Sequence, residues 1–253
     1  MRRDTIYPHR SIRSLEFTPE RILAAILVAV VLTFAMYVGR DRLFVEHNRI
    51  TATLLDLSGI PISGTARIDI FPVLGSADGA VTNIFHYQSS PLRVAILLIS
   101  SIIALLIVHR RVHLARNFIV FLFILLLLAA GIMVFFQSFE LQSAEFTQIW
   151  LREEVLVWFI LPWFSASLFI LARPDAWAGI LWALGVQIFG IVWSAVRLAF
   201  CLALIHYSGL LFVPLLWFTF GLLADNIYLL VFFSISTHQA AGKAWGKRLS
   251  WQF

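Results

Sequence analysis

Long stretches of apolar, uncharged residues alternate with shorter polar stretches along this chain of 253 residues. A bilayer core about 30 Å thick needs roughly 20 apolar residues per helix, so such stretches predict membrane-spanning helices. We place six of them at Ile22–Gly39, Val94–Val108, Asn117–Phe136, Val155–Ala172, Trp177–Ile205 and Leu210–Ile235. The pattern predicts an all-α integral membrane protein with six transmembrane helices.

The first apolar stretch follows a basic tail, as the core of a signal peptide would. It is long, however, and it ends in Met36–Arg40 without a small-x-small cleavage motif, so we interpret it as an anchor. The predicted parts are a tail at 1–21, a first span at 22–39, an outer segment at 40–91, a five-helix membrane domain at 92–236 and a second tail at 237–253.

The basic residues indicate the orientation, because cytoplasmic loops of membrane proteins carry an excess of Lys and Arg. With a cytoplasmic N-terminus, 12 of the 19 basic residues lie inside, in the two tails, the loop at 109–116 and Arg173. Nine of the 14 acidic residues then lie outside. We therefore predict that both termini are cytoplasmic.

The outer segment at 40–91 begins with an amphipathic pattern and continues with an alternating one. In Asn48–Gly59, the apolar residues Ile50, Leu54 and Leu57 follow helical spacing, which predicts a short helix on the membrane surface. Alternation in Thr65–Phe71 and Ala80–Phe85, around the turn-forming stretch Gly75–Gly79, predicts a β-hairpin. About 50 residues are too few for an independent enzyme domain, so we expect this segment to cap the helices or position a substrate.

The composition agrees with a membrane protein. Apolar residues make up 60% of the chain and charged residues 13%, against about 45–50% and 25% in soluble domains. This excludes a cytosolic enzyme, a nucleic-acid-binding module and a disordered tail, and the net charge of +5 is explained by cytoplasmic anchoring. The single cysteine, Cys201, excludes an intrachain disulfide and a multi-cysteine metal site, and we expect no cofactor and no metal.

Polar side chains inside apolar runs are the default candidates for function, because burying them in lipid costs free energy. Arg197 and Asp225 are the charged ones, and Gln187, His206 and Asn226 lie near them in the sequence. Arg197 and Asp225 have nearly the same predicted depth on two antiparallel helices. A structural ion pair between them is one interpretation.

A second interpretation is a polar site on the outer side, built from Arg197, Cys201 and His206. Arg197 and Cys201 lie one turn apart, and a guanidinium can hold a thiolate or a developing oxyanion. His206 is a candidate general acid or base, although it lies about 140° around an ideal helix from Cys201. As an isolated cysteine in an apolar run, Cys201 is equally consistent with a small buried hydrophobic residue.

Glu153 and Glu154 open the fourth predicted helix on its outer side. Carboxylates at a helix N-terminus complement the helix dipole, and the alternative is that they act as acid/base groups or metal ligands. An adjacent Glu pair followed by a His on a later helix is similar to glutamate-type intramembrane proteases. That family has an Arg where this chain has Trp158, and it needs a second His that we do not find.

The order of these elements resembles the exosortase/archaeosortase family of membrane transpeptidases. The stretch Thr51–Thr65 looks like its amphipathic segment leading to Gly-Ile-Pro, Ser194-Ala-Val-Arg197 looks like its Asn-x-x-Arg element, and Ile205–Gly209 looks like its His element. The resemblance implies a bacterial inner-membrane protein that acts on exported proteins with C-terminal hydrophobic tails. It also implies that Arg197 stabilises an oxyanion and that His206 transfers a proton.

The cysteine nucleophile of that family has no counterpart at the expected place. Counting forward from the hairpin leads to Gln88–Ser90, and counting back from Arg197 leads to Arg152–Glu154. Cys201 follows the arginine instead of preceding it, and Ser89 or Ser90 would need an adjacent base to attack a carbonyl. A non-catalytic relative that recognises the same sorting signals is therefore an equal alternative.

Two further classes stay open. A structural or assembly subunit of a larger membrane complex fits the nine Trp and 23 Phe residues, which give the helices wide apolar faces. A transporter is less well supported, because the sequence shows no internal repeat and no pair of Gly/Pro-interrupted helices. The expected partners are membrane lipid and either exported proteins or a membrane complex, and we expect no nucleic acid.

Overall fold

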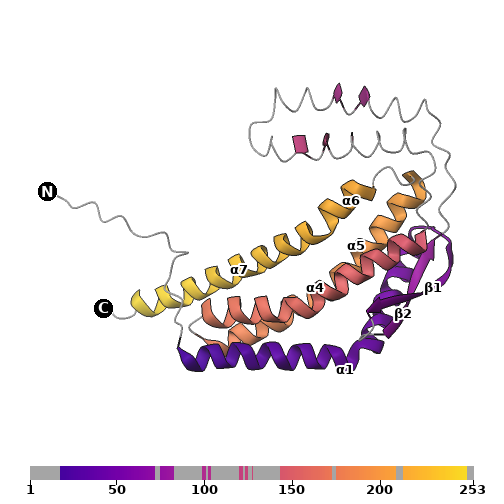
Figure 1. The fold of residues 1–253 in the computed structure, drawn as a ribbon. Coiled ribbons are helices and arrows are strands. Elements are labelled where there is room, and N and C mark those ends of the chain that lie inside the picture. The colour runs from indigo at the N-terminus through magenta and orange to yellow at the C-terminus, as the bar shows by residue number, and fades with distance from the viewer. Residues whose placement is uncertain are drawn as a thin grey trace. The chain divides into compact units, whose positions relative to one another are not determined.

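The computed structural model describes residues 18–71, 75–82, 143–172, 175–208 and 213–249, and nine positions between 99 and 127. The elements are α1 (Pro19–Leu57), β1 (Ile62–Phe71), β2 (Gly75–Thr82), α4 (Ser143–Ala172), α5 (Ala176–Ser208), α6 (Val213–Phe220) and α7 (Leu222–Leu249) (Figure 1). Helices α1, α4 and α5 are long and apolar enough to cross a membrane. The predicted helical membrane class is confirmed at this level. The apolar runs at 94–108 and 117–136 fall largely outside the described residues, so the number of spans stays a prediction.

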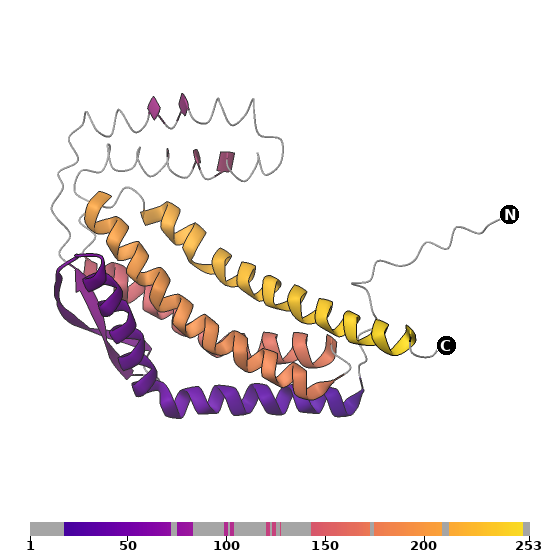
Figure 2. The ribbon, with the colours of Figure 1, turned by 180° about the vertical axis from the view of Figure 1, so that it is seen from behind.

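The chain divides into two compact units. The first consists of Met1–Arg40, Val155–Ile191 and Asp225–Phe253, and the second of Asp41–Glu154 and Val192–Ala224. In the second unit, strands β1 and β2 lie beside the C-terminal end of α1, as the view from behind also shows (Figure 2). Helices α1, α4, α5 and α7 each contribute to both units.

Helix α1 is one continuous helix of 39 residues. The Thr18 hydroxyl accepts a hydrogen bond from the Arg21 N–H at its start. At its end Gly59 adopts a left-handed φ of 70°, and the Ile60 N–H donates to the Leu55 carbonyl, which is the Schellman arrangement. The helix predicted over Asn48–Gly59 is present, but it is the last part of α1 and not a separate element, because the helix runs from Pro19 to Leu57 without interruption. Its location on a membrane surface stays a prediction.

The first unit is held together by close helix packing. Ala25 and Ala29 of α1 pack against Ala166 and Ile170 of α4 in one buried cluster. A Cβ added at Gly179 of α5 would lie 2.8 Å from the Phe169 carbonyl oxygen of α4, so the two backbones touch there. Small residues at helix contacts are the usual means of close packing in membrane proteins.

A proline inside α4 is compensated by a side chain of α5. Pro162 has no N–H, so the carbonyl of Trp158 four residues earlier loses its helical partner. Gln187 donates its Nε2–H to this carbonyl at 3.1 Å and contacts the Met36 sulfur of α1 at 2.9 Å. Gln187 is buried, so it supplies the freed carbonyl with a donor that lipid cannot provide.

The hairpin of the second unit is antiparallel, as the alternation predicts. The register pairs Thr65 with Ala80 and Arg67 with Asp78. The stretch Gly75–Gly79, which the sequence assigned to the turn, instead forms the first half of β2. The Thr147 hydroxyl of α4 donates to the Ala80 carbonyl at 3.2 Å and so connects the hairpin to that helix.

Candidate functional site

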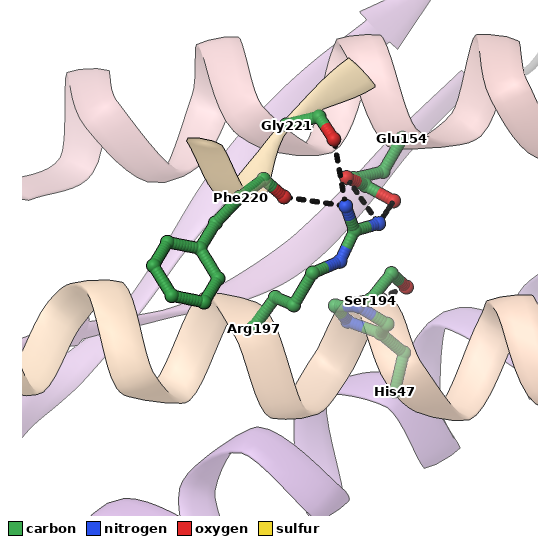
Figure 3. Close-up of polar contacts among 6 residues, drawn as sticks. All are labelled: His47, Glu154, Ser194, Arg197, Phe220 and Gly221. Carbon is green, nitrogen blue, oxygen red and sulfur yellow. Dashed lines mark hydrogen bonds and ion pairs between the residues drawn. The ribbon is translucent and has the colours of Figure 1, made fainter. Parts of the chain in front are cut away.

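The second unit contains a buried arginine whose terminal nitrogens donate to a carboxylate and to a helix end. Arg197 of α5 is 1% exposed, and its Nη2 lies 2.8 and 2.7 Å from the two carboxylate oxygens of Glu154 of α4 (Figure 3). Its Nη1 donates to the Gly221 carbonyl at 3.0 Å and to the Phe220 carbonyl. One guanidinium therefore joins α4, α5 and the end of α6.

The carbonyl groups of Phe220 and Gly221 can accept hydrogen bonds from Arg197 because the sixth predicted run is interrupted between two helices. Helix α6 ends at Phe220, Gly221 forms a turn and α7 begins at Leu222. The Gly221 carbonyl accepts the Ala224 N–H at 3.0 Å, so this turn is tighter than the helical pattern and leaves the Phe220 carbonyl without its usual Ala224 donor. The prediction of a continuous helix over Leu210–Ile235 is therefore wrong at Gly221.

An aromatic cluster lies beside the guanidinium and reaches it through Trp150. The Arg197 guanidinium carbon lies 5.9 Å from the centroid of the Trp150 ring. Trp150 contacts Phe146 of the same helix and Trp217 of α6, with ring centroids 5.7 and 5.8 Å apart. The ion pair beside this aromatic cluster is itself buried, and a buried environment strengthens its electrostatic interaction.

Helix α1 contacts α5 next to this arginine. The His47 Nε2 lies 3.1 Å from the hydroxyl of Ser194, one turn before Arg197 (Figure 3). The Thr51 hydroxyl lies 2.9 Å from the His47 carbonyl and 3.4 Å from the Ala195 carbonyl. The buried side of this part of α1 is formed by Phe44, His47, Thr51 and Leu55.

The stripe of Ile50, Leu54 and Leu57 was assigned to a membrane surface, and this assignment stays a prediction; Leu57 is 78% exposed. The sequence missed His47 and Thr51, because a polar pair at i and i+4 does not show in a hydrophobic pattern. Their spacing with Phe44 and Leu55 is the signal that indicates one helical face.

The two adjacent glutamates have different surroundings. Glu154 is 3% exposed and binds Arg197, whereas Glu153 faces outward. Because α4 begins at Ser143, both lie about three turns inside the helix, and the interpretation that they complement its N-terminal dipole is wrong. The other ion-pair prediction, Arg197 with Asp225, joins residues of different units and stays a prediction.

The predicted cluster of Arg197, Cys201 and His206 does not share one helical face. Helix α5 continues without a break to Ser208, so residues nine positions apart, such as Arg197 and His206, lie on opposite sides of it. Cys201 and His206 are both buried. Ser89 and Ser90 lie outside the described residues, and no group of metal-ligating side chains occurs among those that are described.

No family model, curated protein or solved structure matches this chain.

Proposed function

We propose that this chain is a six-span protein of a bacterial inner membrane, with both termini in the cytoplasm, that recognises exported proteins without cutting them. In this proposal it is an exosortase-like protein whose catalytic chemistry is absent. Its ligands are proteins with C-terminal hydrophobic tails, bound on the outer face, where the hairpin β1–β2 lies in the predicted topology.

The surface of α1 supports the membrane location. Its narrow buried edge carries Ala25 and Ala29, whereas Val31, Phe34 and Val38 are each more than 60% exposed. Large apolar side chains facing outward along some 17 residues are stable in lipid and costly in water. The distribution of basic residues then favours a cytoplasmic N-terminus.

Glu154 is the observation that carries the non-catalytic proposal. It lies within Arg152–Glu154, where the exosortase resemblance, counted back from Arg197, expects the cysteine nucleophile. Instead of a thiol, this place holds a carboxylate that accepts two hydrogen bonds from the arginine. A guanidinium engaged in this way does not stabilise an oxyanion, and His206 lies on the far side of α5.

The two stretches that carry the resemblance also meet in space, which supports kinship. Thr51 belongs to the amphipathic stretch and Ser194 to the element before Arg197, although the two are more than 140 residues apart in sequence. The contact from the Thr51 hydroxyl to the Ala195 carbonyl joins these stretches within the second unit.

A structural or assembly subunit is the second candidate. The same ion pair favours it, because both terminal guanidinium nitrogens of Arg197 donate to groups of this chain. The two candidates differ in their partners. A recognition protein binds several different tailed proteins in turn, whereas an assembly subunit keeps fixed, stoichiometric partners.

Intact masses of exported proteins test the proposal. We would compare a strain that carries this protein with one that lacks it, at matched growth, and capture bound proteins by cross-linking on the outer face. We expect unchanged C-termini and capture of several proteins with hydrophobic tails. A set of proteins that loses its tails only when the protein is present would show that it is a processing enzyme, and capture of one constant set would favour the assembly subunit.

A further inference from the structure

Four oxygen atoms converge on the guanidinium of Arg197. Two belong to the carboxylate of Glu154, at 2.8 and 2.7 Å from Nη2. The other two are the backbone carbonyl oxygens of Phe220 and Gly221, which accept hydrogen bonds from Nη1 (Figure 3). All of these residues belong to the second unit. The side chains of Arg197 and Glu154 are 1% and 4% exposed, so this cluster of oxygens lies inside the protein.

These oxygens are of the kinds that bind hard cations. Carboxylate and backbone carbonyl oxygens are the usual protein ligands of such ions. In membrane proteins, backbone carbonyls at the interrupted end of a helix coordinate sodium ions. The carbonyls of Phe220 and Gly221 lie at such an interruption, between α6 and α7. The ring of Trp150, whose centroid lies 5.9 Å from the guanidinium carbon, also favours a positive charge.

The charge of this cluster determines the valence of the cation that suits it. The Glu154 carboxylate contributes one negative charge, and the two carbonyl groups contribute none. Arg197 supplies one positive charge, which balances the carboxylate. A divalent ion in the same place would leave an uncompensated positive charge in a buried site, which is costly. The cluster therefore matches a single monovalent cation.

We propose that Glu154, Phe220 and Gly221 form a binding site for one monovalent cation, and that Arg197 fills this site with a cation that belongs to the chain itself. The native protein then needs no ion from solution at this place. When the guanidinium is removed, a sodium or potassium ion takes its position, and water enters the remaining polar space and completes the coordination. This inference does not depend on the recognition function proposed above.

The variant Arg197→Ala of the full chain tests the site. We would extract it from membranes into detergent and follow its folded fraction and its unfolding midpoint in sodium chloride, potassium chloride and choline chloride at equal concentrations. Choline is too large for a carbonyl site and controls for ionic screening. We expect the midpoint to rise with the concentration of sodium or potassium and to saturate, as it does when a ligand binds the folded state.

Three matched proteins separate binding from a general effect of salt. The wild type and Arg197→Lys keep a cation of the chain in the site, so the midpoint of each should be the same in all three salts. Arg197→Ala combined with Glu154→Gln lacks the carboxylate and should lose the preference for sodium or potassium over choline.

Two outcomes would overturn the proposal. Equal midpoints of Arg197→Ala in the three salts would mean that the buried carboxyl group is neutralised by a proton and not by a metal ion. Loss of the folded fraction in every salt would also contradict the site, because the proposal requires sodium or potassium to replace the guanidinium. Neither outcome decides the recognition function, which is tested separately by the capture of exported proteins.

Discussion

Both carboxylate oxygens of Glu154 lie within 2.8 Å of one nitrogen, Nη2, of Arg197, although the two residues are 43 positions apart in the sequence. The pair is almost fully buried, at 1% and 4% side-chain exposure. Two charges removed from water in this way are tolerated only when both are well hydrogen-bonded. On the arginine side, Nη1 donates to the carbonyls of Phe220 and Gly221.

Glu154→Gln should destabilise the protein strongly, because it leaves the Arg197 charge buried without its counter-ion. The expected loss is about 3–5 kcal/mol in the free energy of unfolding. Glu153→Gln is the matched control, since the neighbouring carboxylate faces outward and its removal should change little. Thermal unfolding of the purified protein in detergent measures both.

The same ion pair predicts strong coupling between its members. Removing both charges with Glu154→Gln and Arg197→Gln should cost less than the sum of the two single substitutions, because no unpaired charge is left buried. If the double variant instead shows simple additivity, the hydrogen bonds between Glu154 and Arg197 do not contribute as the geometry indicates.

Gln187→Leu should cost about 1–3 kcal/mol, since it leaves the Trp158 carbonyl without a donor. In a Pro162→Ala background the alanine N–H becomes available to that carbonyl, and the cost of Gln187→Leu should shrink. Unfolding midpoints of the four proteins in this cycle decide the matter. An undiminished cost in the alanine background would mean that Gln187 acts through its other contact, the Met36 sulfur.

Gly179→Ala should separate α4 from α5. The new methyl group would lie 2.8 Å from the Phe169 carbonyl oxygen, which is backbone and does not move aside cheaply. We expect a loss of about 1–3 kcal/mol. Gly185→Ala, on the same helix with no atom within 4 Å, should leave the unfolding midpoint unchanged or slightly raised. Equal effects of the two substitutions would contradict the close approach.

Gly59→Ala should weaken the end of α1, because an alanine at a φ of 70° costs about 1–2 kcal/mol. Gly39→Ala lies inside the same helix with open space around it and should stabilise by up to about 1 kcal/mol. Opposite shifts of the unfolding temperature are the expected result. A stabilising Gly59→Ala would show that the left-handed cap is not formed.

The sequence identifies Arg197 and Glu154 as costly groups beside or within apolar runs, but it does not pair them. The position of a residue along a helix predicts its depth in the membrane. It does not predict the direction of its side chain or the helix that the side chain contacts. The sequence also started the fourth helix at Val155, because hydropathy marks where a helix is apolar and not where it begins. The polar first turns from Ser143 onward were therefore missed.

Other residues of the site were missed because they bind backbone carbonyls that are freed where a helix is interrupted. Gln187 and the carbonyls at Phe220 and Gly221 have clear roles once the helix interruptions at Pro162 and Gly221 are known. A proline is visible in the sequence, but the side chain that compensates for it comes from another helix. For the hairpin, alternation predicted the pairing, whereas the turn was misplaced because glycines at 75 and 79 favour turns and are nevertheless tolerated in β2.

The order of the ion pair along the chain has a consequence for biogenesis. Glu154 leaves the ribosome 43 residues before Arg197, which at about 5–20 residues per second is a delay of roughly 2–9 s. During that interval the nascent α4 carries a carboxylate without its counter-charge, and the carbonyl acceptors at 220 and 221 are made later still. We therefore expect α4 to enter the membrane more favourably as a pair with α5, in which Glu154 and Arg197 are already joined, than alone.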